Sequence, residues 1–150
     1  MIDTVDFYRG AAVLQLLRTP RCLEMRAVED GFVVNHRVYF ELKHCTSGKS
    51  RWSFHISDRD VERMIRYSQK PYAVFLGLVC GGDGVCALAL TDVLVVVGSQ
   101  GGRIAAARPY SRSYAVSGSA NGLKRKVPQS DWPRLLLEGA SGGCIDGREG

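Results

Sequence analysis

The stretch LEMRAVEDGFVVNHRVYFELK, residues 23–43, places a turn signal between two segments in which apolar and polar residues alternate. Asp30-Gly31 is a preferred two-residue hairpin turn, because both residues tolerate positive φ. If Glu29 pairs with Phe32, most apolar residues of the two arms meet on one face. The facing pairs are Leu23 with Val38, Met25 with His36 and Ala27 with Val34, while Glu24 faces Arg37 on the other side. The pattern predicts an antiparallel hairpin with one buried face.

A third strand follows the hairpin. The second arm continues to Lys43, and after a loop at residues 45–50 the segment WSFHI, residues 52–56, alternates again. Pairing Leu42 with Trp52 brings Phe40 opposite Phe54, so apolar residues again meet apolar residues. In this register the opposite face is polar and carries Tyr39, Glu41, Lys43, Ser53 and His55.

Two segments are expected to be helices, at residues 4–18 and 58–68, because apolar residues recur there at helical spacing and Asp3 or Thr4 and Ser57 can cap them. An uninterrupted apolar run at 72–79 predicts a central strand, and residues 85–90 a further strand. Residues 91–97 fit a short helix, although their valines also permit a strand. Residues 104–107 and 113–116 are weaker strand candidates.

These elements predict a single α+β domain over residues 1–137, followed by a flexible tail at 138–150. We expect an antiparallel-to-mixed sheet of about five strands, with the two helices packed on its apolar face. The expected core order is helix, strand, strand, strand, helix, strand.

Composition and cysteine content narrow the class of protein. The chain has 150 residues, 45% of them hydrophobic and 23% charged, which is typical of one globular domain. No apolar stretch approaches the ~20 residues that cross a bilayer, and Asp3 and Asp6 stand where a secretory signal carries cations. We therefore expect a cytoplasmic protein without a membrane partner. The cysteines, at 22, 45, 80, 86 and 144, lack zinc-ligand spacing and favour buried thiols, with a Cys80–Cys86 redox pair as the alternative.

The net charge of +5 is concentrated late in the chain, since residues 101–137 hold seven Lys and Arg against one acid. Such a segment suits contact with nucleic acid or another polyanion. Alternatively, this basic segment contacts an acidic protein partner or is simply a solvated surface. The sequence does not indicate the oligomeric state. Arg59, Arg63 and Arg66 of the second helix would extend the surface. The candidate nucleic-acid-binding residues are Arg103, Arg108, Arg112, Lys124, Arg125 and Lys126.

The order of elements over residues 4–80 resembles the core of the PD-(D/E)xK nuclease superfamily, and Glu41-Leu42-Lys43 resembles its E-x-K half-motif. The resemblance implies that Glu41 helps to hold Mg²⁺ and that Lys43 polarises the attacking water. His55, a predicted neighbour on the polar face, is a candidate acid/base or extra ligand. The resemblance also requires a second metal-binding acid, for which Glu24 and Asp30 are the candidates.

Geometry restricts that second acid. Along an uninterrupted strand Asp30 would lie ~35 Å from Glu41, so the two share an ion only if the strand breaks near Asn35. Glu24 would lie ~13 Å away. The E-x-K also falls on the second predicted strand, whereas the superfamily carries it on the third. Two hypotheses therefore stand: a Mg²⁺-dependent or degenerate nuclease, and a non-enzymatic module that binds nucleic acid or protein.

A second resemblance is to a family of small bacterial proteins. It implies a bacterial cytoplasmic origin and nothing about activity. The segments that carry it are Arg9-Gly10-Ala11-Ala12, Trp52-Ser53-Phe54, residues 77–84 and residues 114–119.

Overall fold

The computed structural model describes residues 1–141, which form four α-helices and two β-sheets. In chain order the elements are α1 (Thr4–Leu17), β1 (Met25–Val28), β2 (Gly31–Val34), β3 (Val38–Cys45), β4 (Trp52–Ile56), α2 (Asp58–Ser68), β5 (Ala73–Cys80), β6 (Gly84–Ala89), α3 (Leu90–Val97), β7 (Gly102–Ala107), a 3₁₀ turn (Pro109–Ser111), β8 (Ala115–Gly118) and α4 (Asp131–Ser141).

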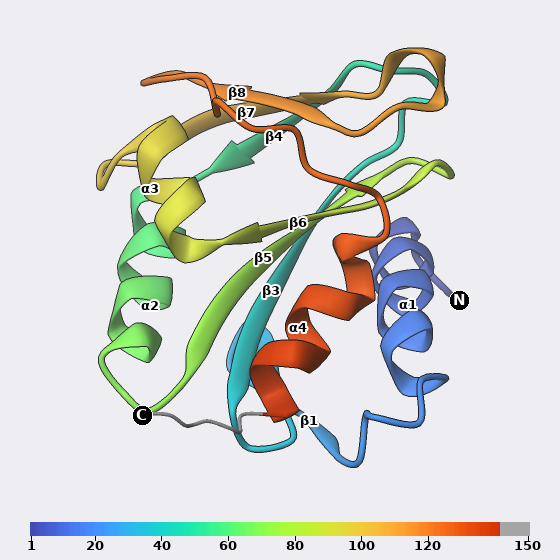
Figure 1. The fold of residues 1–150 in the computed structure, drawn as a ribbon, viewed down its shortest axis with the longest axis vertical. Helices are drawn as coiled ribbons and strands as arrows, with labels where there is room; N and C mark the ends of the chain where they lie inside the picture. The colour runs from blue at the N-terminus through green and yellow to red at the C-terminus, as the bar shows by residue number, and fades with distance from the viewer. Residues whose placement is uncertain (142–150) are drawn as a thin grey trace.

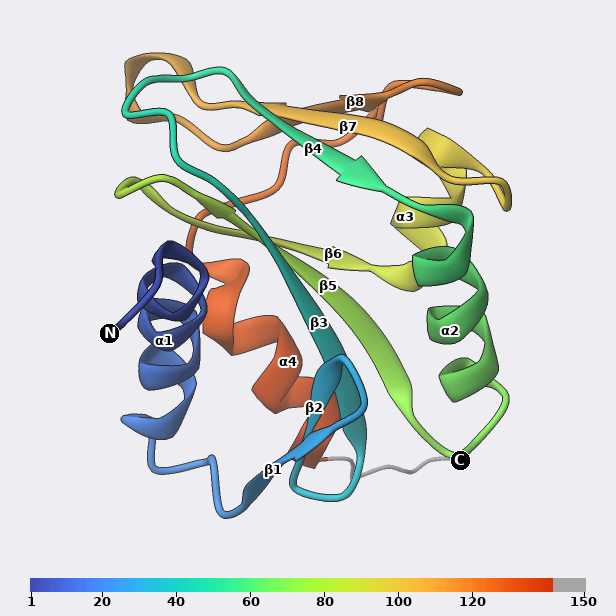
Figure 2. The same cartoon turned by 180° about the vertical axis from the view of Figure 1, so that it is seen from behind.

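The larger sheet is mixed, with the strand order β1-β2-β3-β5-β6. Only β3 and β5 run parallel, and α2 lies in the connection between them. The smaller, antiparallel sheet has the order β4-β7-β8. Helices α1 and α4 cover one face of the larger sheet, whereas α2, α3 and the smaller sheet lie on the other (Figures 1 and 2).

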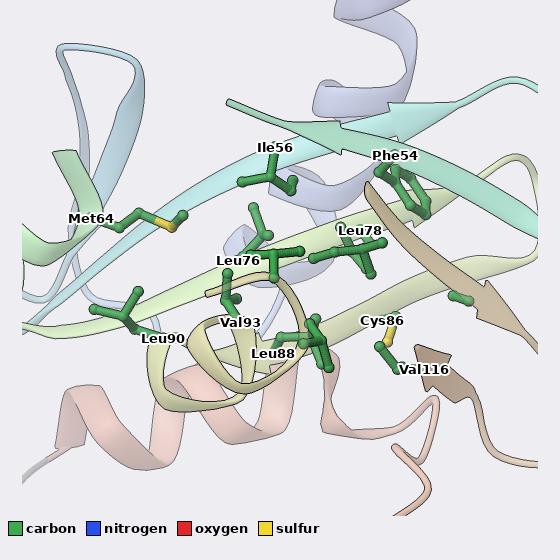
Figure 3. Close-up of a cluster of buried hydrophobic side chains, with 14 of the residues drawn as sticks. Phe54, Ile56, Met64, Leu76, Leu78, Cys86, Leu88, Leu90, Val93 and Val116 are labelled. Carbon is green, nitrogen blue, oxygen red and sulfur yellow. The ribbon is translucent and has the colours of Figure 1, made fainter. Parts of the chain in front are cut away.

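The main hydrophobic core fills the space between the two sheets. Phe54 and Ile56 from β4 meet Leu76 and Leu78 from β5, and α2 and α3 close the sides with Met64 and Val93 (Figure 3). A second cluster lies under α1 and α4, where Phe40 and Trp132 pack edge to face. The larger sheet is therefore buried on both faces, which explains the uninterrupted apolar run of β5.

The predicted hairpin register is wrong. Met25 faces Val34 and Val28 faces Gly31, so Glu29 and Asp30 form the tip of the turn. The strand then breaks at Asn35 and His36, which both adopt positive φ, and β2 turns back along β3 with Phe32 opposite Phe40. Asn35 fixes this second turn, because its side-chain oxygen accepts hydrogen bonds from the Leu23 and Glu24 amides. A single long arm therefore becomes two strands.

The predicted pairing of Phe40 with Phe54 is also wrong, because β3 pairs with β5 and β4 belongs to the second sheet. The two predicted helices lie on opposite faces of the larger sheet rather than on one. Helix α4 was not predicted, and it continues to Ser141, so residues 138–141 of the predicted tail are helical. Residues 142–150 of that tail lie outside the described residues.

Several expectations are confirmed. The helices at 4–18 and 58–68 are present as α1 and α2, and Ser57 caps α2. Strands β5 and β6 occupy the predicted segments, and residues 91–97 are helical rather than extended. None of the helices within residues 1–141 has both the length and the apolar character needed to span a bilayer.

Candidate functional site

Strand β3 directs Tyr39, Glu41 and Lys43 towards α2, since alternate residues of a strand point to the same face. The predicted polar face is present only in part, because Ser53 and His55 belong to the other sheet. The remaining side chains are covered: Glu41 is only 2% exposed and Tyr39 is fully buried. The Tyr39 hydroxyl donates a hydrogen bond to Glu41 Oε2 at 2.6 Å. A buried carboxylate of this kind requires a cationic partner.

That partner is Arg63 of α2, which meets Glu41 in a bidentate arrangement. Its Nε donates to Oε2 at 2.7 Å and its Nη2 donates to Oε1 at 2.8 Å. With the Tyr39 hydroxyl, these contacts engage both oxygens of Glu41. The hydrogen bond with Glu41 is the main reason that the pKa of Arg63 lies above its ordinary value, so the guanidinium is fully charged.

Asp60 lies one turn before Arg63 and accepts a hydrogen bond from Arg63 Nη2 at 2.7 Å. Its other oxygen is held by Lys43 Nζ at 2.8 Å and by the Ser57 amide at 3.0 Å, because Asp60 also completes the capping box of α2. Burial opposes ionisation of Asp60, but the hydrogen bonds from Lys43, Ser57 and Arg63 outweigh it and hold the pKa of this carboxyl below its ordinary range.

Asp30 reaches the same guanidinium because the strand breaks at Asn35. Arg63 Nη1 lies 3.0 Å from Asp30 Oδ2. The β1–β2 hairpin must approach β3 closely here, and Gly31 permits it: a Cβ at this position would lie 2.5 Å from the Phe40 carbonyl oxygen and 2.8 Å from the Tyr39 hydroxyl. The acidic and basic residues thus converge from β3, α2 and the hairpin tip.

These groups, together with Arg9 of α1, line a polar cavity of about 200 Å³. We call Asp30, Glu41, Lys43, Asp60 and Arg63 the carboxylate cluster. Its three carboxylates are matched by two cations, and Arg9 adds a third positive charge at the wall of the cavity. The cluster itself therefore carries one negative charge in excess, and the nearby Arg9 offsets it.

The resemblance to PD-(D/E)xK nucleases implies Mg²⁺ at this place, and the arrangement does not fit the ion. Mg²⁺ is held by carboxylate oxygens at ~2.0–2.1 Å, and here Arg63 occupies the space between them. Within residues 1–141, no group of three or more His, Cys, Asp or Glu side chains is placed to hold a metal ion.

The structure brings together some of the predicted site residues and separates others. Glu41, Lys43 and Asp30 line the same cavity, and Glu41-Leu42-Lys43 lies on the third strand of the chain rather than on the second as predicted. His55 is exposed on the second sheet, opposite Arg103, and Glu24 contacts His36 at 3.7 Å, so neither joins the cluster.

The sequence placed Arg63 on an expected nucleic-acid surface, and nothing in it singled out Asp60 as a site residue. Their spacing of three residues, which puts both on one side of the helix, was the available signal. Asp30 lies beside Arg63 because the strand breaks at Asn35, and the sequence does not require this break.

The candidate nucleic-acid-binding residues of the basic segment 101–137 fall into two groups in the structure. Arg108 forms a bidentate pair with Asp83, both contacts at 2.8 Å, and Arg125 pairs with Asp92 at 2.6 Å. The pairing with Arg108 is the main cause that lowers the pKa of Asp83. Both arginines are therefore engaged in ion pairs within the protein, Arg108 largely buried and Arg125 with a side chain that is 49% exposed. The remaining four candidates, Arg103, Arg112, Lys124 and Lys126, have exposed side chains.

Cys22, Cys45, Cys80 and Cys86 are free thiols. Cys80 and Cys86 are buried as expected, whereas Cys22 and Cys45 are only half-buried. Burial raises the pKa of the Cys80 thiol to about 12 and raises that of Cys86 as well. Low-pKa reactivity is therefore unfavourable at both. Cys144 lies outside the described residues.

No protein-family model matches the chain, and neither the curated proteins nor the solved structures contain a match. The class of protein is therefore described by its structure, which is an α+β domain with two sheets and a buried ionic cluster under α2.

Proposed function

We propose that this protein binds nucleic acid without cleaving it and that it keeps a nuclease-like core in which the Arg63 guanidinium takes the position of the metal. The observation that carries the proposal is the convergence of three carboxylates, Asp30, Glu41 and Asp60, on this one guanidinium. A guanidinium satisfies the carboxylates electrostatically, but it does not activate a water molecule as a metal ion does.

The nuclease-like character rests on the placement of three residues. Asp30 ends the turn before β2, and Glu41 and Lys43 project together from β3. The core order helix, strand, strand, strand, helix, strand is kept if β4, which joins the other sheet, is set aside as an insertion. Asp30 is then the acid that the resemblance requires.

The binding function rests on charge. In the carboxylate cluster and in the Asp83 and Asp92 pairs, five of the 15 Asp and Glu side chains are engaged by cations of the same chain. The net charge of +5 is therefore carried by exposed cations, among them Arg103, Arg112, Lys124 and Lys126. Exposed lysines and arginines that neutralise phosphates supply most of the affinity in sequence-independent binding.

The test incubates the protein with labelled single-stranded and duplex DNA and RNA in Mg²⁺, and measures binding and strand integrity in the same samples. We expect salt-sensitive binding and intact strands. No binding at low salt would contradict the proposal, and so would cleavage that depends on Mg²⁺ and is lost in Glu41→Ala or Lys43→Ala.

A Mg²⁺-dependent nuclease is the second candidate, because Asp30, in the turn before β2, lines the same cavity as Glu41 and Lys43 of β3. In that case Glu41→Ala and Lys43→Ala should each abolish cleavage and leave DNA binding intact. Arg63 would then have to leave the carboxylates in the active state. The same experiment therefore separates the two candidates.

A further inference from the structure

We infer that the outer face of the second sheet is the surface that holds the phosphodiester backbone of nucleic acid. This inference rests on the proposed function and adds the place of contact. The face belongs to β4, β7 and β8, and Figures 1 and 2 show that no helix of residues 1–141 covers it, since α3 lies on its inner side.

Two adjoining depressions cross this face. One has a volume of about 250 Å³ and extends towards Leu123, and the other has a volume of about 350 Å³ and extends towards Ser119. Both are lined by Arg51, Ala105 and Ser117, so the two depressions adjoin. We call the two depressions together the sheet groove.

Small side chains form the floor of the sheet groove. Ser53, Ala105 and Ser117 lie in one row across the three strands, because Ser53 pairs with Ala105 and Ala105 pairs with Ser117. Ala107 and Ala115 form the next row. A floor of serine and alanine lets an extended backbone lie close to the sheet. Serine hydroxyls can also donate hydrogen bonds to phosphate oxygens.

Cations border the groove. Arg51 belongs to the lining of both depressions and Arg103 to that of the larger one. Guanidinium groups suit this position because they bind phosphate oxygens in a bidentate manner. The segment 122–127 runs beside β8, as shown by the hydrogen bond from the Leu123 amide to the Val116 carbonyl at 2.9 Å, and it carries the exposed Lys124 and Lys126.

The two chain segments that form this sheet contain no acidic residues. Residues 44–57, which include β4, contain no Asp or Glu, and neither do residues 93–130, which include β7 and β8. The two segments come from distant parts of the chain and meet only in the second sheet. Their combination therefore produces a face of one charge sign, which attracts polyanions and focuses them on the groove.

The groove favours nucleic acid over an acidic protein. Tight protein interfaces depend on apolar anchors that fill pockets, and the floor of serine and alanine offers none. No aromatic residue lines either depression, so contacts go to phosphates and the binding is independent of base sequence.

The experiment measures fluorescence anisotropy of a labelled oligothymidylate of about 20 nucleotides, and of a duplex, over a range of salt concentrations. The charge variant is Arg51→Gln/Arg103→Gln, and its matched control is Arg26→Gln/Arg37→Gln, two exposed arginines at the β1 end of the molecule. For the single strand we expect the charge variant to lower the log–log salt slope by about 1.4, that is about 0.7 for each lost phosphate contact. The control should keep the slope of the original protein.

A second variant tests the groove without a change of charge. Ser117→Tyr places a ring on the floor, and Ala27→Tyr adds the same ring at an exposed position of β1. We expect Ser117→Tyr to lose most binding and Ala27→Tyr to keep it, with circular dichroism and thermal melting confirming that both are folded. Binding by general electrostatic attraction alone would leave Ser117→Tyr unaffected, and that result would overturn the inference.

The outcomes separate the two proposals. If the original protein binds no oligonucleotide, the proposed function fails and the inference fails with it. If it binds and the groove variants bind equally well, only the inference fails. Unlabelled oligonucleotide, poly-glutamate and phosphatidylserine vesicles are then compared as competitors of the labelled oligonucleotide. If all three displace it equally at the same concentration of negative charge, nucleic acid is not the preferred occupant and the inference is overturned.

Discussion

Arg63 contacts three carboxylates that come from three separate elements, so its removal affects more than one ion pair. Glu41 is buried, and without Arg63 its charge would remain uncompensated in the protein interior. Breaking one side of a buried pair costs about 3–5 kcal/mol. Asp30 is 65% exposed at its side chain and contributes little by comparison.

We therefore expect Arg63→Met to lower the free energy of unfolding by about 3 kcal/mol or more, as measured by urea denaturation. The matched control is Arg59→Met, an exposed position on the same helix, where we expect a change within about 0.5 kcal/mol. Adding Glu41→Gln to Arg63→Met should restore part of the loss, because the buried group is then neutral. Equal effects at positions 63 and 59 would contradict this account of the cluster.

At the residue scale, the sequence allowed Glu41 and Lys43 to be identified because strand alternation alone puts them on one face. Asp30 could not be placed, because its position depends on Asn35. Positive φ at Asn35 is sterically permitted but not required by the residue type, and it is selected by hydrogen bonds with the segment before β1. Those contacts are tertiary and leave no local signal.

At the scale of elements, α2 carries the site because its first turn is fixed. Ser57 Oγ accepts a hydrogen bond from the Asp60 amide at 3.0 Å, and the Asp60 side chain in return accepts one from the Ser57 amide. The capping box therefore orients Asp60 towards Lys43 and Arg63.

We expect Ser57→Ala to lower the free energy of unfolding by about 1 kcal/mol through loss of the cap. The same change at Ser68, exposed at the other end of the helix, is the control and should have a smaller effect. Thermal melting of the two variants checks the difference. A larger loss at Ser68 would show that the capping box does not hold α2 in place.

Helices α1 and α2 and strands β5 and β6 could be predicted, since each has a strong pattern and clear end signals. Strand β4 was predicted as an element but given the wrong neighbour. Trp52, Phe54 and Ile56 alternate equally well beside β3 or beside β7, so the pattern cannot choose between them. Helix α4 has Pro133 within its first turn and only a short apolar stripe, which made its pattern weak.

At the scale of the whole molecule, stability should depend on pH at both ends of the range. Hydrogen bonds from Arg66 and Tyr67 lower the pKa of Glu29 from 4.5 to about 2, so the unfolded chain binds this proton more readily. Stability is therefore lost as pH falls from about 4.5 towards 2. Burial raises the pKa of Cys80 from 9.0 to about 12, so the unfolded chain releases this proton first. Stability is lost again as pH rises above about 9.

Urea denaturation as a function of pH should show a plateau from about pH 5 to pH 8, with both arms falling. Glu29→Gln should reduce the slope of the acid arm, to which the lowered pKa values of Asp60 and Asp83 also contribute. Cys80→Ala should reduce the slope of the alkaline arm, to which the raised pKa of Cys86 also contributes. An acid arm unchanged by Glu29→Gln would show that the contacts of Glu29 with Arg66 and Tyr67 do not contribute to folding.

The central claim is that Arg63 occupies the position of a metal ion among Asp30, Glu41 and Asp60. The most direct test is a calorimetric titration of the intact protein with Mg²⁺. We expect no saturable binding at millimolar concentrations, because the oxygens of Glu41 are already engaged by Arg63 and Tyr39. Saturable binding of one ion per chain that disappears in Glu41→Gln would contradict the claim.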